Sequence, residues 1–228
     1  MRFSIKLALF AFTLAASLLP AYGQDDYYKW EGFGGYSYMN LDRGVDLDRF
    51  VNSDQNRVNS HGFNGSVTYN FTRYFGAKFD VTLHTHGEDF QGVLTTNPPP
   101  PTLPPPGTFK VSQSDYQFMG GIQIKDNRKD GPRFKPFGHA LLGGAFQSFT
   151  LDQTQPVDVR LFKVDKTDLA AKFGGGIDIR VTKNIDARVI QFDFNPIWRG
   201  HTNFGPPFGD VEGVIRTNWL LTFGVAFH

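Results

Sequence analysis

Cysteine is absent from the 228-residue sequence. A chain without cysteine forms no disulfide bond, and it offers no thiol to which the lipid of a lipoprotein could be attached. The folded state must therefore draw its stability from the burial of side chains and from backbone hydrogen bonds.

Long hydrophobic runs and an excess of one charge are also missing. After residue 23, no stretch approaches the roughly 18 consecutive apolar residues that would indicate a transmembrane helix. The formal net charge of the chain is +1, which gives no electrostatic reason to bind a polyanion. Nucleic acid is therefore not an expected partner.

The first 23 residues have the three parts of a secretory signal peptide: a positive start, an apolar stretch and small residues before the cut. These parts are Arg2 with Lys6, Leu7–Leu19, and Ala21 with Gly23. We expect cleavage between Gly23 and Gln24, so that residues 24–228 form the mature protein. An uncleaved membrane helix is the alternative, but the apolar stretch is too short to span a bilayer comfortably.

Aromatic residues, glycine and a period of two are abundant. Aromatic residues make up 15% of the sequence, with 24 Phe, and there are 25 Gly. Along residues 75–86, apolar and polar side chains alternate as in a half-buried strand. The run 62–71 alternates in the same way, and only residues 72–74 separate the two. This arrangement predicts an antiparallel hairpin with a tight turn.

Eight such runs predict eight strands, each long enough to cross a bilayer at a tilt. The runs are 30–40, 62–71, 75–86, 109–124, 136–148, 168–180, 185–194 and 217–227. Long connections at 41–60, 87–108, 149–167 and 195–216 alternate with short ones at 72–74, 125–135 and 181–184. An up-and-down membrane barrel requires this alternation, and a soluble sandwich does not. The predicted fold is therefore all-β: an eight-stranded antiparallel up-and-down transmembrane β-barrel.

The polar face of these strands carries charges of both signs. A barrel of eight strands is just wide enough for side chains to fill its interior. We therefore expect a lumen closed by paired charges rather than a water channel. The predicted lumen charges are Lys78, Asp80, Asp115, Lys172, Asp178 and Arg180. In the run 185–194, Arg188 and Asp193 fall on opposite faces, and a bulge near Val189 would reconcile them.

Glycine doublets interrupt three of the predicted strands, at 34–35, 120–121 and 143–144, and a triplet lies at 174–176. Glycine normally weakens a strand. In a narrow closed barrel it relieves crowding where the sheet bends, so these positions are consistent with the predicted fold.

Taken together, these features resemble the OmpA-type outer-membrane β-barrel family. The resemblance rests on the signal peptide, Gly32–Tyr38, Lys135–Ala145, Phe173–Arg180 and the final aromatic strand, and it covers residues 24–228. It implies residence in the cell outer membrane, contact with the lipid there, and insertion by the outer-membrane assembly machinery. It implies a barrel alone, because the peptidoglycan-binding domain of OmpA itself is not carried over.

The final strand has an unbroken apolar face that we expect to contact lipid. This face consists of Trp219, Leu221, Phe223, Val225 and Phe227. Members of the resembled family usually end on an aromatic residue that the assembly machinery reads, so the resemblance places the assembly signal on this strand. The sequence departs from that pattern, because Phe227 is penultimate and His228 is last.

No catalytic, cofactor-binding or metal-binding residue is assigned. The sequence has no Gly-x-Ser-x-Gly, His-Glu-x-x-His or P-loop motif, so no enzyme is expected. His84 and His86 share a face, but their spacing specifies no third metal ligand. Two alternatives stay open: a lipid-modifying enzyme that uses a Ser/His pair from different strands, and a narrow porin-like channel.

The predicted function is that of a structural anchor or surface-interaction protein presenting four long extracellular loops. The second loop contains Pro98–Pro106, a stretch expected to form extended polyproline II. It is either a solvated loop or a stiff recognition arm for an extracellular partner.

Overall fold

The computed structural model describes residues 26–42, 57–92, 107–155, 158–200, 202–203, 210–211 and 213–228. The predicted signal peptide, its cleavage site and the proline-rich stretch 98–106 lie outside the described residues. No helix in the described part of the chain is long and apolar enough to cross a membrane.

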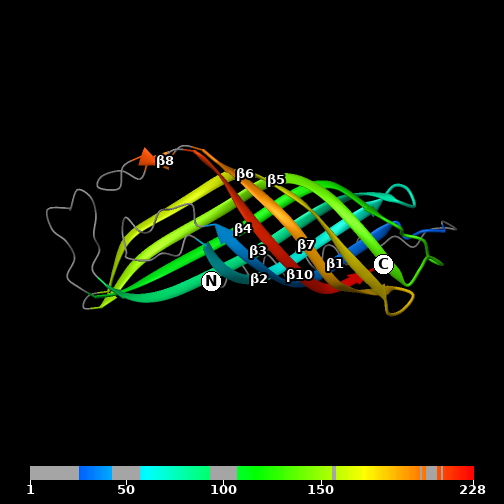
Figure 1. Ribbon diagram of the computed structural model, residues 1–228, viewed down its shortest axis with the longest axis horizontal. Coiled ribbons are helices and arrows are strands. Elements are labelled where there is room, and N and C mark those ends of the chain that lie inside the picture. Colours follow the sequence, from blue (N-terminus) through cyan, green and yellow to red (C-terminus); the bar gives the residue numbers. More distant parts are fainter. Residues whose placement is uncertain are drawn as a thin grey trace.

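Eight long strands close into one antiparallel barrel, which confirms the predicted fold class (Figure 1). They are β1 (Trp30–Asp42), β2 (Arg57–Asn70), β3 (Phe75–Gly92), β4 (Gly107–Lys125), β5 (Phe134–Gln155), β6 (Val159–Arg180), β7 (Ile185–Arg199) and β10 (Val214–Phe227). Two short strands, β8 (Thr202–Asn203) and β9 (Asp210–Val211), pair with each other. The order around the barrel is β1-β10-β7-β6-β5-β4-β3-β2.

The first and last long strands close the sheet. Gly32 lies opposite Phe227, and Asn40 lies opposite Trp219, with unbroken pairing between them. Closure gives the edge of each strand a partner, so the backbone polar groups are satisfied within the sheet. A barrel with this property can stand in hydrocarbon, where an open edge cannot.

The connections at one end of the barrel are short, at 71–74, 126–133 and 181–184. Short turns of outer-membrane barrels face the periplasm, and the longer connections face the outside. We therefore assign the end with the short turns as periplasmic and the opposite end as the outer end.

The prediction of four long outer loops is wrong for the third. Residues 149–167 are mostly strand, because β5 runs to Gln155 and β6 starts at Val159. The strands also extend into the other predicted loops, leaving 43–56, 93–106 and 200–213 between them. Toward the outer end of β4 the apolar residues change sides: Ser112 and Ser114 lie on the outward face, and Phe109 and Val111 are buried on the other. Backbone pairing continues there although the outward face is no longer apolar.

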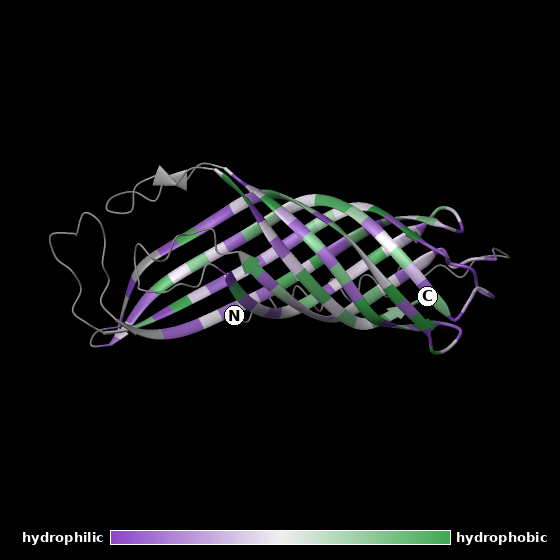
Figure 2. Cartoon of the chain, viewed as in Figure 1, coloured by the Kyte–Doolittle hydropathy of each residue, from purple (hydrophilic) through white to green (hydrophobic). Residues whose placement is uncertain are grey.

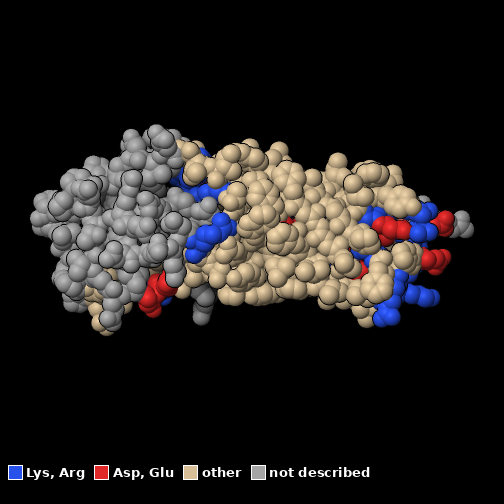
Figure 3. Space-filling model, viewed as in Figure 1, with Lys and Arg blue, Asp and Glu red and all other residues tan. Residues whose placement is uncertain are grey.

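Hydropathy alternates along the strands, as the coloured bands in Figure 2 show. On the face drawn in Figure 3, the middle of the barrel is almost free of charge, and charged side chains gather toward the two ends. The outward row of β10 follows this pattern, with Trp219 41%, Phe223 39% and Phe227 50% exposed. Large apolar side chains with this exposure are suited to contact with lipid rather than with water.

The pairing of β7 is irregular at Val189, where the sequence indicates a bulge. On one side Ile177 pairs with Ile190 and Asp178 with Arg188, so Val189 has no partner in β6. Val189 and Ile190 are both exposed. The extra residue brings Arg188 and Asp193 to the same, inner face of the strand, where both are buried.

Each glycine doublet divides its two residues between the faces of the sheet. A Cβ atom on Gly121 would press into the Ala140 carbonyl and lie 2.8 Å from the Leu141 Cα, whereas one on Gly120 would meet nothing within 4 Å. The inner glycine is therefore required by the close approach of the neighbouring strand, and the outer one is not.

Candidate functional site

The lumen is the candidate site, because it gathers most of the buried charge of the described chain. At its periplasmic end, Arg188 donates to both oxygens of Asp178, from Nε at 2.8 Å and from Nη2 at 3.0 Å. Lys125 Nζ lies 2.6 Å from Asp178 Oδ2 and 2.6 Å from Glu31 Oε2. The Arg188 Nη2 also donates to Glu31 at 3.1 Å. Four side chains from four strands thus form one closed ionic network.

A second group extends this network toward the last residue. Asp186 accepts from Lys135 Nζ at 2.8 Å. The His228 Nε2 lies 2.8 Å from the same carboxylate oxygen, and the His228 ring stacks on Tyr28 at 4.4 Å between ring centroids. The periplasmic end of the lumen is therefore closed by side chains that are fixed by charge pairing and stacking.

A third group lies farther along the lumen. Lys172 Nζ donates to Asp80 Oδ1 at 2.6 Å and to Thr82 Oγ1 at 2.7 Å. His139 Nε2 lies 3.0 Å from Asp193 Oδ1. These groups are buried, and buried charges of this kind persist only when they are paired and hydrogen-bonded.

Apolar side chains also line part of the interior, which the sequence alternation does not indicate. One cluster joins Met119, Leu141, Ala145, Ala170 and Ile197. A second cluster joins Met39, Leu41 and Leu220 from β1 and β10. The lumen is therefore not polar throughout.

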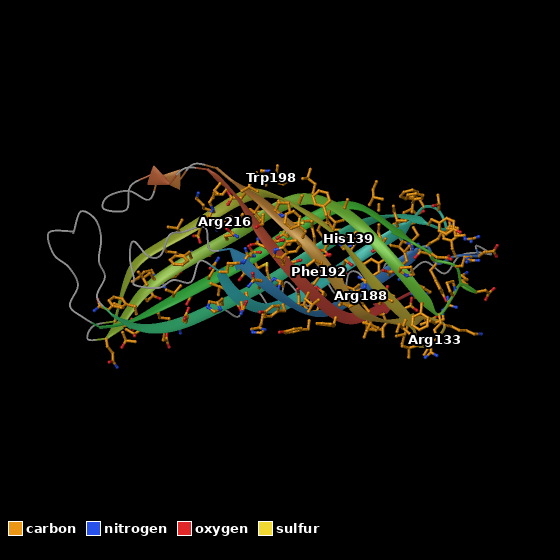
Figure 4. The ribbon with its side chains drawn as sticks, in the orientation of Figure 1. Arg133, His139, Arg188, Phe192, Trp198 and Arg216 are labelled. Carbon is orange, nitrogen blue, oxygen red and sulfur yellow. The ribbon has the colours of Figure 1, made fainter. Side chains whose placement is uncertain are left out.

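Nearer the outer end, amide side chains connect the charged groups. Asp115 accepts from Gln117 Nε2 and from Gln147 Nε2, both at 2.7 Å. The Gln147 Oε1 in turn accepts from Arg199 Nη2 at 2.6 Å and from Arg216 Nη1 at 3.4 Å. Figure 4 shows Arg133, Arg188 and Arg216 in that order from the periplasmic end toward the outer end.

Five of the six lumen charges expected from the sequence are buried inside the barrel. These are Lys78, Asp80, Asp115, Lys172 and Asp178. Arg180 differs, because it is half-buried at the periplasmic rim and donates to the backbone carbonyls of Gly131 and Arg128. Its position at the end of β6 places it on the turn 126–133 rather than among the paired charges.

Other buried ionic groups were not among the predicted lumen charges. They are Glu31, Lys125, Lys135, His139, Asp168, Asp186, Arg188, Asp193 and Arg216. Lys125 and Lys135 lie one residue beyond the predicted strands 109–124 and 136–148. Continuing the alternation of inward and outward residues by one position would have identified both. The bulge expected near Val189 brings Arg188 and Asp193 to one face, although neither residue was counted as a lumen charge.

The predicted lipid-facing row of the final strand points outward. Val225 is 37% exposed, and Leu221 is half-buried. Among neighbouring strands, Phe192 stacks on Trp219 with 5.2 Å between ring centroids, and Trp198 is also exposed on the outer surface (Figure 4). The row therefore belongs to a continuous aromatic surface.

His84 and His86 do not form a recognisable metal site. His84 is buried and His86 is half-buried, with His86 Nε2 3.7 Å from Glu88 Oε2. Within the described ranges, no group of three or more His, Cys, Asp or Glu residues could hold a metal ion.

The closed eight-stranded barrel, its outward aromatic surface and its filled lumen define a membrane barrel of the outer-membrane type. A family model described as "Outer membrane protein beta-barrel domain" matches residues 7–227. The chain therefore belongs to the outer membrane protein beta-barrel family, and it is an outer-membrane β-barrel protein.

Solved structures of outer-membrane barrels are similar to the chain at low sequence identity. Neisserial surface protein A is 12% identical, with a TM-score of 0.53, and the match covers 89% of this chain and 99% of that chain. Ail of Yersinia pestis is 13% identical, with a TM-score of 0.46, covering 88% and 100%. OprG from Pseudomonas aeruginosa is 14% identical, with a TM-score of 0.46, covering 90% and 98%. None of the curated proteins matches the sequence.

Proposed function

We propose that the barrel anchors a sheet of strands at the cell surface, through which the protein contacts an extracellular partner. In this proposal the barrel lies in the lipid of the outer membrane and is inserted there by the outer-membrane assembly machinery. It assigns the chain no enzymatic activity.

The observation that carries the proposal is the unequal length of the strands at the outer end. Pairing of β3 with β4 continues to Gly92 opposite Gly107, but pairing of β2 with β3 stops at His61 opposite Thr85. The strands β3, β4, β5 and β6 therefore continue past their neighbours as an open sheet (Figure 1).

The opposite margin of this sheet has the same character. Pairing of β5 with β6 continues to Gln153 opposite Val159, whereas β6 and β7 part beyond Leu169 and Trp198. A membrane anchor does not need strands that extend beyond the closed part of the barrel. A paired sheet that continues from the barrel at the outer end is suited to presenting side chains to a partner.

The same structure argues against the porin-like alternative. Lys172 on β6 pairs with Asp80 on β3, and Lys125 on β4 pairs with Glu31 on β1, so both ion pairs cross the lumen between strands that are not neighbours. All four side chains are buried. A solute path would need these ion pairs to separate, which leaves buried charges without partners.

The first experiment places the open sheet relative to the cell surface. The chain has no native cysteine, so Asp158→Cys and Lys183→Cys give single-cysteine variants at opposite ends of the barrel. A membrane-impermeant maleimide should label Asp158→Cys on intact cells and Lys183→Cys only after lysis. The reverse labelling would contradict the orientation.

The second experiment removes the outer part of the β5–β6 hairpin. Phe149 and Val164 are paired partners, so residues 150–163 can be replaced by an Asn-Gly turn that keeps the barrel register. Cells carrying this variant should lose autoaggregation or attachment to protein-coated surfaces that wild-type cells show. An unchanged difference in gel mobility with and without boiling would verify the barrel, and unchanged attachment would contradict the proposal. Steady conductance in planar bilayers would favour a channel instead.

A further inference from the structure

Two arginines are buried among the described residues, Arg188 and Arg216, and both lie beside a glutamine side-chain oxygen. Arg188 donates from Nη1 to the Gln191 side-chain oxygen at 2.9 Å. Its Nε and Nη2 donate to the two oxygens of Asp178 at 2.8 Å and 3.0 Å. One edge of the Arg188 guanidinium is thus matched by a carboxylate, and its remaining nitrogen by an amide.

Arg216 reproduces the amide contact without the carboxylate. Its Nη1 lies 3.4 Å from the Gln147 Oε1. The Arg216 side chain is buried, with the residue 1% exposed, and its Nε and Nη2 have no hydrogen-bond partner. Among the described residues, no carboxylate forms an ion pair with Arg216.

The unpartnered edge has a definite chemical preference. The N–H groups of Nε and Nη2 point in the same direction from the planar guanidinium. Their spacing matches two oxygens of one carboxylate or phosphate, with two parallel hydrogen bonds. The Asp178 carboxylate occupies this edge of Arg188 in the same barrel.

The neighbours of Arg216 do not supply that anion. The Gln147 Oε1 also accepts from Arg199 Nη2 at 2.6 Å, so two guanidinium groups converge on one amide oxygen. Asp168 lies beside Arg199, with 3.4 Å between Asp168 Oδ2 and Arg199 Nε. Asp115 is held by the Gln117 and Gln147 amides. The two cations repel each other, and an anion between or beside them would relieve that repulsion.

A buried charge without a partner is strongly unfavourable, and each unsatisfied buried group in a native protein calls for an explanation. Arg216 lies near the outer start of β10, opposite Ile197 of β7. Arg216 therefore lies closer to the outer end of the closed barrel than Arg188 does (Figure 4).

We propose that the Nε and Nη2 edge of Arg216 binds an oxyanion, a carboxylate or a phosphate group, at the outer end of the lumen. The bound oxygens take the place that Asp178 occupies on Arg188. Arg199 contributes a second positive charge, and Gln147 orients both guanidinium groups. This binding site does not depend on the function of the open sheet, so either proposal can fail alone.

The test uses the full mature chain, refolded in detergent micelles, with arginine labelled by ¹⁵N. The Nε–H resonance of Arg216 is assigned by its loss in Arg216→Lys. Inorganic phosphate and acetate are titrated separately at constant ionic strength, with sodium chloride as the background. We expect a saturable shift of the Arg216 Nε–H resonance with at least one probe.

Variants distinguish the site from a general salt effect. The ligand also raises the thermal unfolding midpoint of the wild type, because it binds the folded state. Arg216→Lys keeps the charge but loses the paired donors, so the concentration of anion needed for half of this stabilisation should rise about tenfold or more. Arg160→Lys is the matched control, since Arg160 is exposed and pairs with Asp152. It should respond as the wild type does.

Some outcomes identify the ligand, and others overturn the proposed site. A response to phosphate alone assigns a phosphate ligand, a response to acetate alone assigns a carboxylate, and both responses support the shared chemistry. Absence of a saturable shift with either probe overturns the proposal, as does an equal anion response in Arg216→Lys. If Arg216→Lys fails to fold, Arg216→Gln provides the second variant, and the wild-type titration still stands.

Discussion

The His228 Nε2 lies 2.8 Å from the Asp186 Oδ2, which ties residue 228 into the ionic network of the lumen. The backbone N–H of His228 also donates to the Asn184 carbonyl at 3.0 Å. The histidine that follows Phe227 thus has a structural role of its own. Phe227 faces outward with half of its surface exposed, and His228 turns inward and packs on Tyr28.

Substitution of His228 should weaken the folded state modestly. In His228→Ala, Asp186 keeps its contact with Lys135 at 2.8 Å and lies 3.7 Å from Lys125. We therefore expect a loss of about 1.5–3 kcal/mol in the free energy of unfolding, the value of one hydrogen bond to a charged group. Urea titration of protein refolded in lipid vesicles measures this difference. A loss as large as that from removing Lys135 would show that His228 holds the whole network.

Substitution of Phe227 should act on insertion more than on stability. In Phe227→Ala, the inward contacts of His228 stay in place, and only an outward aromatic side chain is lost. We expect less barrel assembled in cells, because the resembled family presents a terminal aromatic to the assembly machinery. Quantifying the folded band in outer-membrane fractions checks this, with His228→Ala as the comparison. Normal assembly of Phe227→Ala would move the signal to His228 or to the strand as a whole.

The strands within the lipid band could be predicted from sequence because lipid and lumen impose opposite polarity on alternate residues. β10 is the clearest example: Thr222 is fully buried and the neighbouring Phe223 is exposed. The same logic indicated the irregularity at Val189, since Arg188 and Asp193 could not otherwise share the interior. Alternation of apolar and polar residues therefore predicts a strand wherever one face of the sheet contacts lipid and the other faces the lumen.

Other parts of the strands could not be predicted from sequence, because outside the lipid band the outward face of a strand need not be apolar. Beyond the lipid band both faces of β5 and β6 tolerate polar residues, so strand 159–167 resembled a loop. Arg216 stood in the predicted fourth loop for the same reason, although it is buried at the start of β10. Which charges pair also depends on register between distant strands, as for Lys125 and Glu31, and no local pattern encodes that register.

The glycine doublet at 120–121 gives a matched test of barrel crowding. Gly121→Ala forces a Cβ against the Ala140 carbonyl and the Leu141 Cα, so we expect it to destabilise the barrel by about 1–3 kcal/mol. Gly120→Ala meets no atom within 4 Å and should change stability by less than about 0.5 kcal/mol. Unfolding in vesicles measures both. If the two variants lose the same stability, strand propensity rather than the close approach of β5 explains why glycine is needed at position 121.

The ion pair between Lys172 and Asp80 should be sensitive to loss of one partner. Asp80→Asn leaves the Lys172 ammonium buried beside Thr82 without its carboxylate, at an expected loss of about 3–5 kcal/mol. The double variant Asp80→Asn with Lys172→Met removes both charges and should recover part of that loss. A double-mutant cycle of unfolding free energies checks the coupling. Strictly additive losses would show that the two groups do not stabilise each other.

The outward row of β10 provides a depth-dependent test of lipid contact. Phe223 lies midway between Trp219 and Phe227 in this row, and it is 39% exposed. Phe223→Arg puts a charge near the middle of the hydrocarbon, where we expect a loss of about 2–4 kcal/mol in folding free energy. Phe223→Leu keeps the surface apolar and should lose less than about 1.5 kcal/mol.

Thr217 has the same outward parity nearer the outer end of the strand, opposite Pro196. Because the penalty for arginine falls to about 0–1 kcal/mol near the interface, Thr217→Arg should be tolerated. Refolding titrations of the three variants in vesicles of one lipid measure the gradient. If Phe223→Arg is as stable as Thr217→Arg, residue 223 does not face the bilayer centre, and the position assigned to the lipid band along β10 must be shifted.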